Sequence, residues 1–305
     1  MAKPDVSVVI PLYNKARYVL RAIESVTKQT IGADEIIVVD DGSTDNGADV
    51  VQNIPDARIR LIRQENQGPG AARNRGLRSA SSNYISFLDA DDEWLPEFLG
   101  TAFDVLTANC DCQLFVGGHF KTRNQLPFST ATRFSFWGVH KGACEMSPES
   151  ISAYMVNVFI DFFHSGGIVA EKSVVEKFGG YYERGCLFGE DTYLWLQVAL
   201  NCKAYLWPEP LMWYHTENSS LNTKDGACRL SPVLSDPEPI RRNCPPGLKD
   251  YLEDVLGGYA VTAAERRWRA NQKEAAKQLL RSFPRSEQIL QFFPESEAVL
   301  RLFFT

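Results

Sequence analysis

Hydrophobic residues near the start of the chain fall into short runs typical of buried β-strands, separated by stretches with helical spacing. The strand-like runs occupy residues 6–10, 35–39, 59–63 and 84–88. We expect Pro11 to end the first run, because proline cannot donate a hydrogen bond to a sheet. Helices are expected where Val19, Leu20, Ile23 and Val26 share one stripe, and at 70–80. Strands alternating with helices in this way predict an α/β fold with a largely parallel sheet.

The pattern becomes less regular after residue 95. We expect helices at 95–108 and 190–200, and strands at 113–118 and from residue 204 onward. Residues 226–247 contain five prolines and predict a linker. Residues 248–305 are expected to be helical, with breaks near Gly257-Gly258 and at Asn271. We therefore divide the chain into an α/β domain at 1–225, the linker and a C-terminal helical region at 248–305.

Polar residues follow three of the predicted strands. The loops after these strands contain Tyr13-Asn14, Asp40-Asp41 and Asp89-Ala90-Asp91. Ligands of parallel α/β sheets bind outside the carboxyl ends of the strands. Three loops from distant parts of the sequence are therefore expected to meet at one crevice.

The third of these loops is the best candidate for a metal site. Strand geometry would send the side chains of Asp89 and Asp91 to the same side. Two carboxylates at a strand end suit a divalent cation that binds oxygen ligands and leaves room for phosphates. Taken alone, the motif would be an ordinary solvated acidic turn, but the convergence of the three loops weakens that interpretation.

Residues 67–76 combine glycines with a predicted helix start and two arginines, Arg73 and Arg75. A helix N-terminus offers free N–H groups and a positive dipole end, so a diphosphate could bind there. The segment also suggests another fold, since Gly68-x-Gly70 followed by Asp89 resembles a dinucleotide fingerprint. Against this alternative, Arg73 occupies the third glycine position, and one ribose-binding acid would not explain Asp91.

Two further candidates lie later in the chain. Glu190 and Asp191 open a predicted helix, where carboxylates are favoured by capping and by the helix dipole, but where one could also act as a general base. His215 follows an aromatic run and is either a structural hydrogen-bonding residue or an additional ligand at the Asp89 loop.

Composition excludes several classes of protein. The chain has 305 residues and a net charge of −6, which argues against nucleic acid binding because that needs a basic surface. No run approaches the roughly 20 apolar residues that cross a bilayer. Seven scattered cysteines, and no apolar signal segment before Val6, favour reduced thiols and a cytoplasmic location.

Together these motifs resemble the inverting family 2 glycosyltransferases of the GT-A fold. The segments that carry the resemblance, in chain order, are 6–14, 37–45, 66–74, 87–92 and 189–191. The resemblance implies a GT-A type, Rossmann-like α/β fold with a mostly parallel sheet flanked by helices. In it, residues 1–95 would bind the nucleotide and residues 96–225 the acceptor.

The resemblance also implies a nucleotide diphosphate sugar as donor, expected to be UDP-linked. Asp40 would hold the base of the nucleotide, and Arg73 would lie near the nucleotide. The other residues expected to line the same pocket are Pro11, Tyr13, Asn14 and Asp41. Asp91 would bind Mg²⁺ or Mn²⁺ at the diphosphate, and Asp89 would contact ribose or the metal.

The acceptor side follows from the same resemblance. Asp191 would be the general base that removes the proton of the acceptor hydroxyl, with Glu190 beside it in contact with substrate. His215 falls where some members place a further metal ligand, although Trp213-Tyr214-His215 stands where an arginine often separates Tyr and His. The acceptor would be a carbohydrate or a lipid-linked sugar, as in the synthesis of cell-surface polysaccharides and glycans.

Two other functions stay open on the sequence alone, an NAD-dependent oxidoreductase and a non-catalytic nucleotide-sugar-binding protein. The Glu190-Asp191 pair argues against the second. The terminal Leu302-Phe303-Phe304 could make a peripheral contact with the inner face of a membrane. The C-terminal helices could instead pack on the main domain or join two copies in a homo-oligomer.

Overall fold

The computed structural model describes residues 5–123, 126–129, 131, 140–186, 188–216 and 230–292. Its strands are β1 (Val6–Leu12), β2 (Glu35–Asp41), β3 (Ile59–Gln64), β4 (Tyr84–Phe87), β5 (Glu93–Trp94), β6 (Leu114–Arg123), β7 (Leu126–Ser129), β8 (Gly142–Cys144), β9 (Ile168–Glu171) and β10 (Ala204–Tyr214). Its helices are α1 (Val19–Thr27), α2 (Gly47–Gln52), α3 (Pro69–Ser79), α4 (Phe98–Ala108), α6 (Val156–Ile160), α7 (Lys172–Lys177), α8 (Glu190–Asn201), α9 (Pro232–Ser235), α10 (Glu238–Asn243), α11 (Lys249–Arg269), α12 (Lys273–Ser282) and α13 (Ser286–Ile289).

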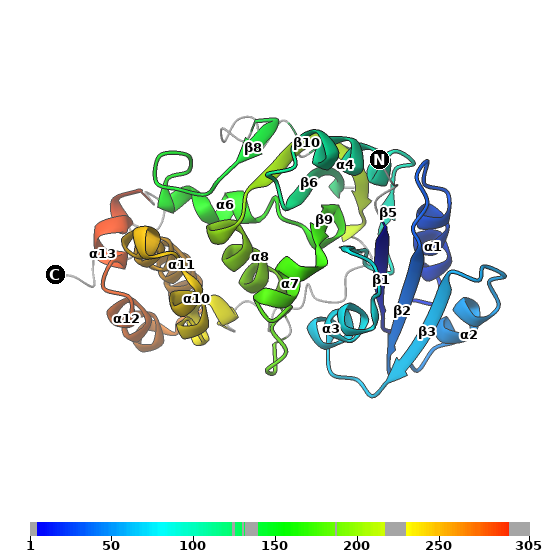
Figure 1. The fold of residues 1–305 in the computed structure, drawn as a ribbon. Helices are drawn as coiled ribbons and strands as arrows, with labels where there is room; N and C mark the ends of the chain where they lie inside the picture. Colours follow the sequence, from blue (N-terminus) through cyan, green and yellow to red (C-terminus); the bar gives the residue numbers. More distant parts are fainter. Residues whose placement is uncertain are drawn as a thin grey trace.

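One sheet runs through the molecule in the order β3-β2-β1-β4-β9-β6-β10-β5 (Figure 1). Strands β1 to β4 pair in parallel, and β6 pairs in parallel with β10. Strand β9 runs antiparallel between β4 and β6 and so joins the two parallel parts. The predicted α/β fold class is confirmed.

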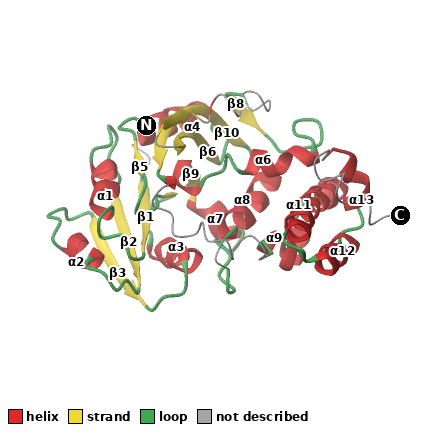
Figure 2. Ribbon diagram, turned by 180° about the vertical axis from the view of Figure 1, so that it is seen from behind, coloured by secondary structure: helices red, strands yellow, loops and turns green. Residues whose placement is uncertain are grey.

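Helices cover both faces of the sheet, which explains why its strands are nearly continuous apolar runs. Val8 and Ile10 of β1 pack in one core with residues of α1 and α4. Val9, between them, belongs to the other core, which continues through α3, α7 and α8 to the C-terminal helices. Figures 1 and 2 show α1 and α2 beside the first strands and α11 to α13 at the opposite end of the molecule.

Two expectations about the first elements are wrong in detail. Strand β1 does not end before Pro11 but continues to Leu12. Strand β4 pairs with β1 only as far as Val9, so β1 has a single paired neighbour at Pro11 and a proline is tolerated there. Leu20, expected on the buried stripe of the first helix, is 44% exposed, and Ala22 takes its place in the core.

The C-terminal part also differs from expectation. The segment 226–247 contains the short helices α9 and α10, whose Val233 and Ile240 are buried in the main core. Helix α11 runs unbroken through Gly257-Gly258, which corrects the break expected there. A Cβ on Gly257 would approach the backbone of Arg285 to 3.0 Å. This glycine therefore permits close packing against the chain before α13. The expected break at Asn271 is confirmed, with a φ of 61°.

No helix in the described part of the chain has both the length and the apolar character needed to cross a membrane. The membrane contact expected at Leu302-Phe303-Phe304 lies outside the described residues.

Candidate active site

A cavity of about 270 Å³ opens where β1, β2 and β4 end. Its lining includes Pro11, Tyr13, Lys15, Asp41, Gly68, Arg73, Asp89, Asp91, Glu190, Tyr214 and His215. The structure thus brings together loops after three strands, the start of α3, the start of α8 and the end of β10. Three residues expected at the site, Asn14, Asp40 and Asp191, lie close in sequence to lining residues but do not line the cavity.

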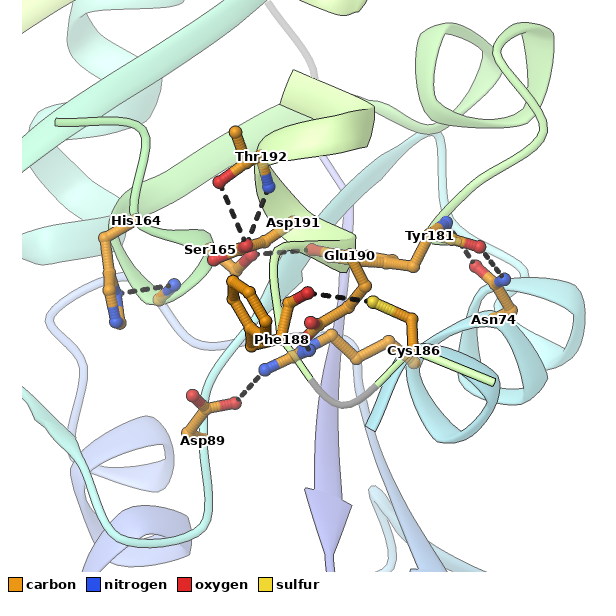
Figure 3. A network of polar contacts seen from close by, with 12 residues as sticks. Asn74, Asp89, His164, Ser165, Tyr181, Cys186, Phe188, Glu190, Asp191 and Thr192 are labelled. Carbon is orange, nitrogen blue, oxygen red and sulfur yellow. Dashed lines mark hydrogen bonds and ion pairs between the residues drawn. The ribbon is translucent and has the colours of Figure 1, made fainter. Parts of the chain in front are cut away.

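Arg73 joins two carboxylates that are far apart in sequence, those of Asp89 and Glu190, both of which are labelled in Figure 3. Its Nη2 donates to Oδ1 of Asp89 at 2.6 Å, and its Nη1 donates to Oε1 of Glu190 at 2.8 Å. The guanidinium also lies 5.1 Å from the ring centre of Tyr181. Helix α3 therefore connects the loop after β4 with the first turn of α8.

The three charges of this cluster depend on one another. Arg73 is only 5% exposed, and although burial favours its neutral form, Asp89 and Glu190 keep its pKa well above the ordinary value. Burial would also raise the pKa of Asp89, but Arg73 holds that pKa below its usual range. Burial and the neighbouring Asp191 raise the pKa of Glu190, a change that Arg73 opposes. A buried arginine between two carboxylates is stable only while all three are present.

Asp91 faces a different cation. Nζ of Lys15 donates to its Oδ2 at 2.6 Å, and Arg21 donates to its backbone carbonyl. Burial and the nearby charge of Asp89 raise the pKa of Asp91. A cation bound beside Asp91 would lower this pKa again.

Asp92 was not among the residues predicted for the site, although it is the third aspartate in the motif. It is only 1% exposed, and its Oδ1 accepts a hydrogen bond from the backbone N–H of His215 at 2.9 Å. Its Oδ2 has no partner within the described part of the chain. Burial and the charge of Asp89 raise the pKa of Asp92 well above its ordinary value.

Asp89, Asp92 and His164 are the residues whose arrangement comes nearest to a metal site in the described ranges. One ligand atom from each lies within 4.8 Å of the others. Carboxylate oxygens are suitable ligands for Mg²⁺ or Mn²⁺. Since Arg73 uses one oxygen of Asp89 and Lys15 one oxygen of Asp91, each carboxylate keeps a second oxygen that could face a cation.

The imidazole of His164 fits a cation less well than the carboxylates do. Its Nδ1 accepts a hydrogen bond from the backbone N–H of Gly166 at 3.2 Å. In the neutral ring the proton must then reside on Nε2, so neither nitrogen offers a lone pair to a metal. Burial lowers the pKa of His164, so the neutral ring is favoured, while Asp89 acts in the opposite direction.

His215 lines the cavity but is not part of this cluster. Its Nε2 lies 3.2 Å from Oε1 of Glu93, and its backbone is fixed by Asp92. Its role as a metal ligand stays a prediction.

The two aspartates that end β2 have separate roles because neighbouring side chains of a strand point in opposite directions. Asp41 accepts hydrogen bonds from the backbone N–H groups of Gln67 at 2.9 Å and Gly68 at 2.8 Å. It thereby fixes the loop that leads into α3 and occupies N–H groups there. Asp40 accepts from the backbone N–H of Ser43 at 3.0 Å and stabilises the following turn. Its predicted contact with the nucleotide base stays a prediction.

Asn14 also serves its own loop. It has a φ of 52°, and its Oδ1 accepts the backbone N–H of Thr44 at 2.8 Å. Its backbone N–H donates to Oγ of Ser43 at 3.1 Å. From this loop the cavity is lined by Tyr13, which is 47% exposed, and by Lys15.

The first turn of α8 presents the two acidic residues in different ways. Gly189 precedes the helix with a φ of 80°, which lets the chain turn sharply into it. Glu190 then faces Arg73, while Oδ1 of Asp191 accepts the backbone N–H of Thr192 at 2.7 Å (Figure 3). Asp191 therefore lies beside the cavity wall, with one oxygen engaged at the helix start.

Known proteins match this chain mainly over its N-terminal half. Residues 7–148 match the sequence model described as Glycosyl transferase family 2. An uncharacterized glycosyltransferase of Nostoc sp. is 48% identical over 104 residues, which are 33% of this chain and 32% of that protein. The chain thus aligns with only about a third of this relative.

Solved structures resemble the chain over nearly its whole length. S. aureus TarS 1-349 in complex with UDP-GlcNAc has a TM-score of 0.70 at 18% identity and covers 94% of this chain and 83% of that one. The mannosyltransferase PcManGT of Pyrobaculum calidifontis, in complex with GDP-Man and Mn²⁺, has a TM-score of 0.58 at 18% identity and covers 98% and 81%. At these identities the likeness establishes the fold.

The alternative of an NAD-dependent oxidoreductase is wrong. The glycines on which it rested lie inside the stretch that matches glycosyl transferase family 2. In the structure, moreover, Arg73 at the third glycine position is the buried centre of the charge cluster and not part of an open dinucleotide turn.

Proposed function

We propose, since residues 7–148 match the model of glycosyl transferase family 2, that this chain transfers a sugar from a UDP-linked donor to an acceptor hydroxyl. The transfer inverts the anomeric carbon and is assisted by a divalent cation. The observation that carries the proposal is the single cavity at which Arg73 joins Asp89, after β4, to Glu190, at the start of α8. This contact supports a leaving-group site at Asp89 with the candidate base Asp191 next to Glu190 in sequence.

The donor would lie along the ends of β1, β2 and β4. Tyr13 is exposed at the mouth of the cavity and offers a flat surface to the base of the nucleotide. The diphosphate would lie near Asp89 and Asp91, where Lys15 adds a positive charge. The UDP-GlcNAc in the TarS structure supports a uridine nucleotide as donor.

Asp89 and Asp91 would hold Mg²⁺ or Mn²⁺, and the Mn²⁺ in the PcManGT structure supports this assignment. When bound, the cation offsets the negative charge that develops on the departing diphosphate. Arg73 and Lys15 each leave one carboxylate oxygen available on these aspartates. His164 is excluded from our ligand set because its Nδ1 is engaged by Gly166.

Asp191 is the proposed general base. Thr192 engages its Oδ1, so Oδ2 would take the proton as the acceptor oxygen attacks the anomeric carbon. Transfer needs one base and a stabilised leaving group, whereas glycoside hydrolysis needs two carboxyl groups flanking the bond. Glu190 is turned toward Arg73 and holds the helix start in place.

The acceptor is proposed to be a carbohydrate or a lipid-linked sugar in the synthesis of cell-surface polysaccharides or glycans. We propose that the reaction takes place in the cytoplasm or at the inner face of the membrane, where nucleotide sugars are available.

A ligand panel tests the proposal directly. We expect UDP with Mn²⁺ to raise the melting temperature, because a ligand at 100 times its Kd stabilises a folded protein by about 2.7 kcal/mol. GDP with Mn²⁺ and NAD are the controls. The release of UDP is then measured for each member of a panel of UDP-sugars, with water as the acceptor when no other is added. This identifies the UDP-sugar that the enzyme uses. Stabilisation by NAD alone, or no response to any nucleotide, would refute the proposal.

The metal assignment has its own test. Asp91→Asn should weaken UDP binding in the presence of Mn²⁺ by at least the roughly 10–100-fold known for residues that merely support metal ligands. His164→Asn is the matched variant, since it keeps an acceptor for Gly166 and should leave Mn²⁺-dependent affinity nearly unchanged. Isothermal titration calorimetry of UDP with and without Mn²⁺ measures both. An equal loss of Mn²⁺-dependent UDP affinity in the two variants would show that the imidazole of His164 is also a ligand.

A further inference from the structure

Helix α3 uses one face to contact the segment Tyr181–Glu183, which lies shortly before α8. Gly70, Asn74 and Arg78 are spaced by four residues and so share that face. A Cβ on Gly70 would lie 2.5 Å from the carbonyl oxygen of Tyr182. Nη1 of Arg78 lies 3.5 Å from Oε1 of Glu183, an exposed pair that contributes little. The strongest contacts are made by Asn74, between these two.

Asn74 is 3% exposed and binds both backbone groups of one residue. Its Oδ1 accepts the N–H of Tyr181 at 2.8 Å, and its Nδ2 donates to the carbonyl oxygen of Tyr181 at 2.7 Å (Figure 3). The second proton of Nδ2 is donated to Oε1 of Glu183 at 2.7 Å. This complementary set fixes the orientation of the amide and the place of the chain at Tyr181.

The residue before Tyr181 is a glycine, and this contact requires the absence of a side chain there. Gly180 has a φ of 73°, and a Cβ there would lie 2.3 Å from Oδ1 of Asn74. Gly179 has a similar φ of 80°, but a Cβ there would meet nothing within 4 Å. The two neighbouring glycines are alike in backbone conformation and differ in whether Asn74 is beside them.

The same helix also holds the chain on the far side of this segment. Arg73, the neighbour of Asn74, binds Glu190, so consecutive residues of α3 fix two points of the chain on either side of residues 184–189. Asp191 follows directly on the second point. Since a displacement of about 1 Å in a reacting group can cost 100-fold in rate, such fixation is functionally significant.

We propose that Asn74 is a positioning residue, which uses Tyr181 and Glu183 to set the location of the candidate base Asp191 relative to the donor side of the cavity. The inference rests on the proposed glycosyl transfer. Asn74 lies outside the cavity lining. Its loss should therefore lower turnover at saturating donor while leaving donor affinity intact.

The two glycines provide a matched test. Gly180→Ala should reduce kcat for UDP release by about 100-fold relative to Gly179→Ala, with KM for the UDP-sugar and Kd for UDP–Mn²⁺ both within threefold of wild type. Strain from a positive φ is common to both variants, so the difference reports the contact with Asn74. Equal kcat values, or a fall in UDP affinity parallel to kcat, would overturn the proposal.

A double-mutant cycle keeps the test specific. In an Asn74→Ala background, Gly180→Ala should lower kcat no more than Gly179→Ala does in the wild type, because the clash and the hydrogen bonds have been removed together and only the strain of the positive φ remains. Additive losses would contradict a shared mechanism. Thermal unfolding of each variant identifies any that lose activity merely by unfolding.

A readout without turnover separates this inference from the proposed function. Asn74→Ala should make hydrogen exchange at the amides of Thr192 and Tyr193 at least about tenfold faster, because the start of α8 loses one of its anchors. Unchanged exchange overturns the positioning role even if the enzyme is active. Faster exchange in a protein that releases no UDP from any UDP-sugar would uphold the positioning of α8 and refute the glycosyltransferase activity.

Discussion

Replacing Asp191 by asparagine should reduce sugar transfer by about 10²–10⁴-fold, the usual contribution of a general base, while UDP still binds as it does to the wild type. The amide keeps Oδ1 as an acceptor for Thr192, so the start of α8 should stay intact. It cannot take up the proton of the acceptor hydroxyl. UDP release in the presence of acceptor measures the first effect, and calorimetry with UDP and Mn²⁺ the second.

Asp49→Asn is the matched control for this variant. Asp49 also lies in the first turn of a helix, α2, but its side chain is 71% exposed and does not line the cavity. Its replacement should leave the rate of transfer unchanged. This control measures the general effect of removing a carboxylate charge from a helix start outside the cavity. Transfer by Asp191→Asn at a rate near that of wild type would show that another group is the base.

Arg73→Met should lower the free energy of unfolding by about 3–5 kcal/mol, because removing one partner of a buried ion cluster leaves the others uncompensated. Asp89 and Glu190 would then be two carboxylates near each other without their shared cation. Urea unfolding followed by tryptophan fluorescence measures the loss. Arg75→Met, on the exposed side of the same helix, is the control and should change stability by less than about 0.5 kcal/mol.

The loss of stability in Arg73→Met should depend on pH and should be smaller at low pH. The pKa of Asp89 is lowered in the folded wild type, so the charged carboxylate stabilises the fold above its ordinary pKa of 3.8, and this contribution disappears as pH falls through the lower folded value. In Arg73→Met, protonation would instead relieve the uncompensated charge. The difference in free energy of unfolding between wild type and Arg73→Met should therefore become smaller as the pH falls. If the difference in free energy of unfolding is the same at every pH, Arg73 stabilises the fold by packing alone.

The sheet was predictable because its strands are buried on both faces and appear as apolar runs of the expected length. The fold was also predictable from the order of strands and helices. The exact course of β1 was not, since Pro11 is tolerated only because β4 stops early, and that depends on a partner more than 70 residues away in sequence. The unbroken α11 was missed for a similar reason. Gly257 serves a contact with Arg285, and sequence cannot distinguish such a glycine from a helix breaker.

The site was predictable in outline, because loops after parallel strands meet at one edge. The partners within it were not. Arg73 was expected near the nucleotide, yet its two outer nitrogens are engaged by Asp89 and Glu190. The contact with Glu190 joins residues that are 117 positions apart in sequence. Asp92 could have been suspected from the three clustered aspartates. His164 carried no signal, and Asn74 belonged to the segment 66–74 without an assigned role, because their surroundings arise only when α3, β4 and the chain before α8 are packed together.

The two cores of the molecule differ in how much of the chain each requires. Among the described residues, the buried members of the core beneath α1 and α4 lie within 6–115, except for Val169, Leu211 and Met212. The core on the opposite face includes Val9 near the start but also Leu280 and Leu290 near the other end. During synthesis on the ribosome, the first can be largely assembled early, whereas the second must wait for the last helices to emerge. The nascent protein would thus expose the apolar residues of α6 until α11 has emerged, and those of α11 until α12 and α13 follow, so we expect chaperones to bind these surfaces and misassembly to begin there.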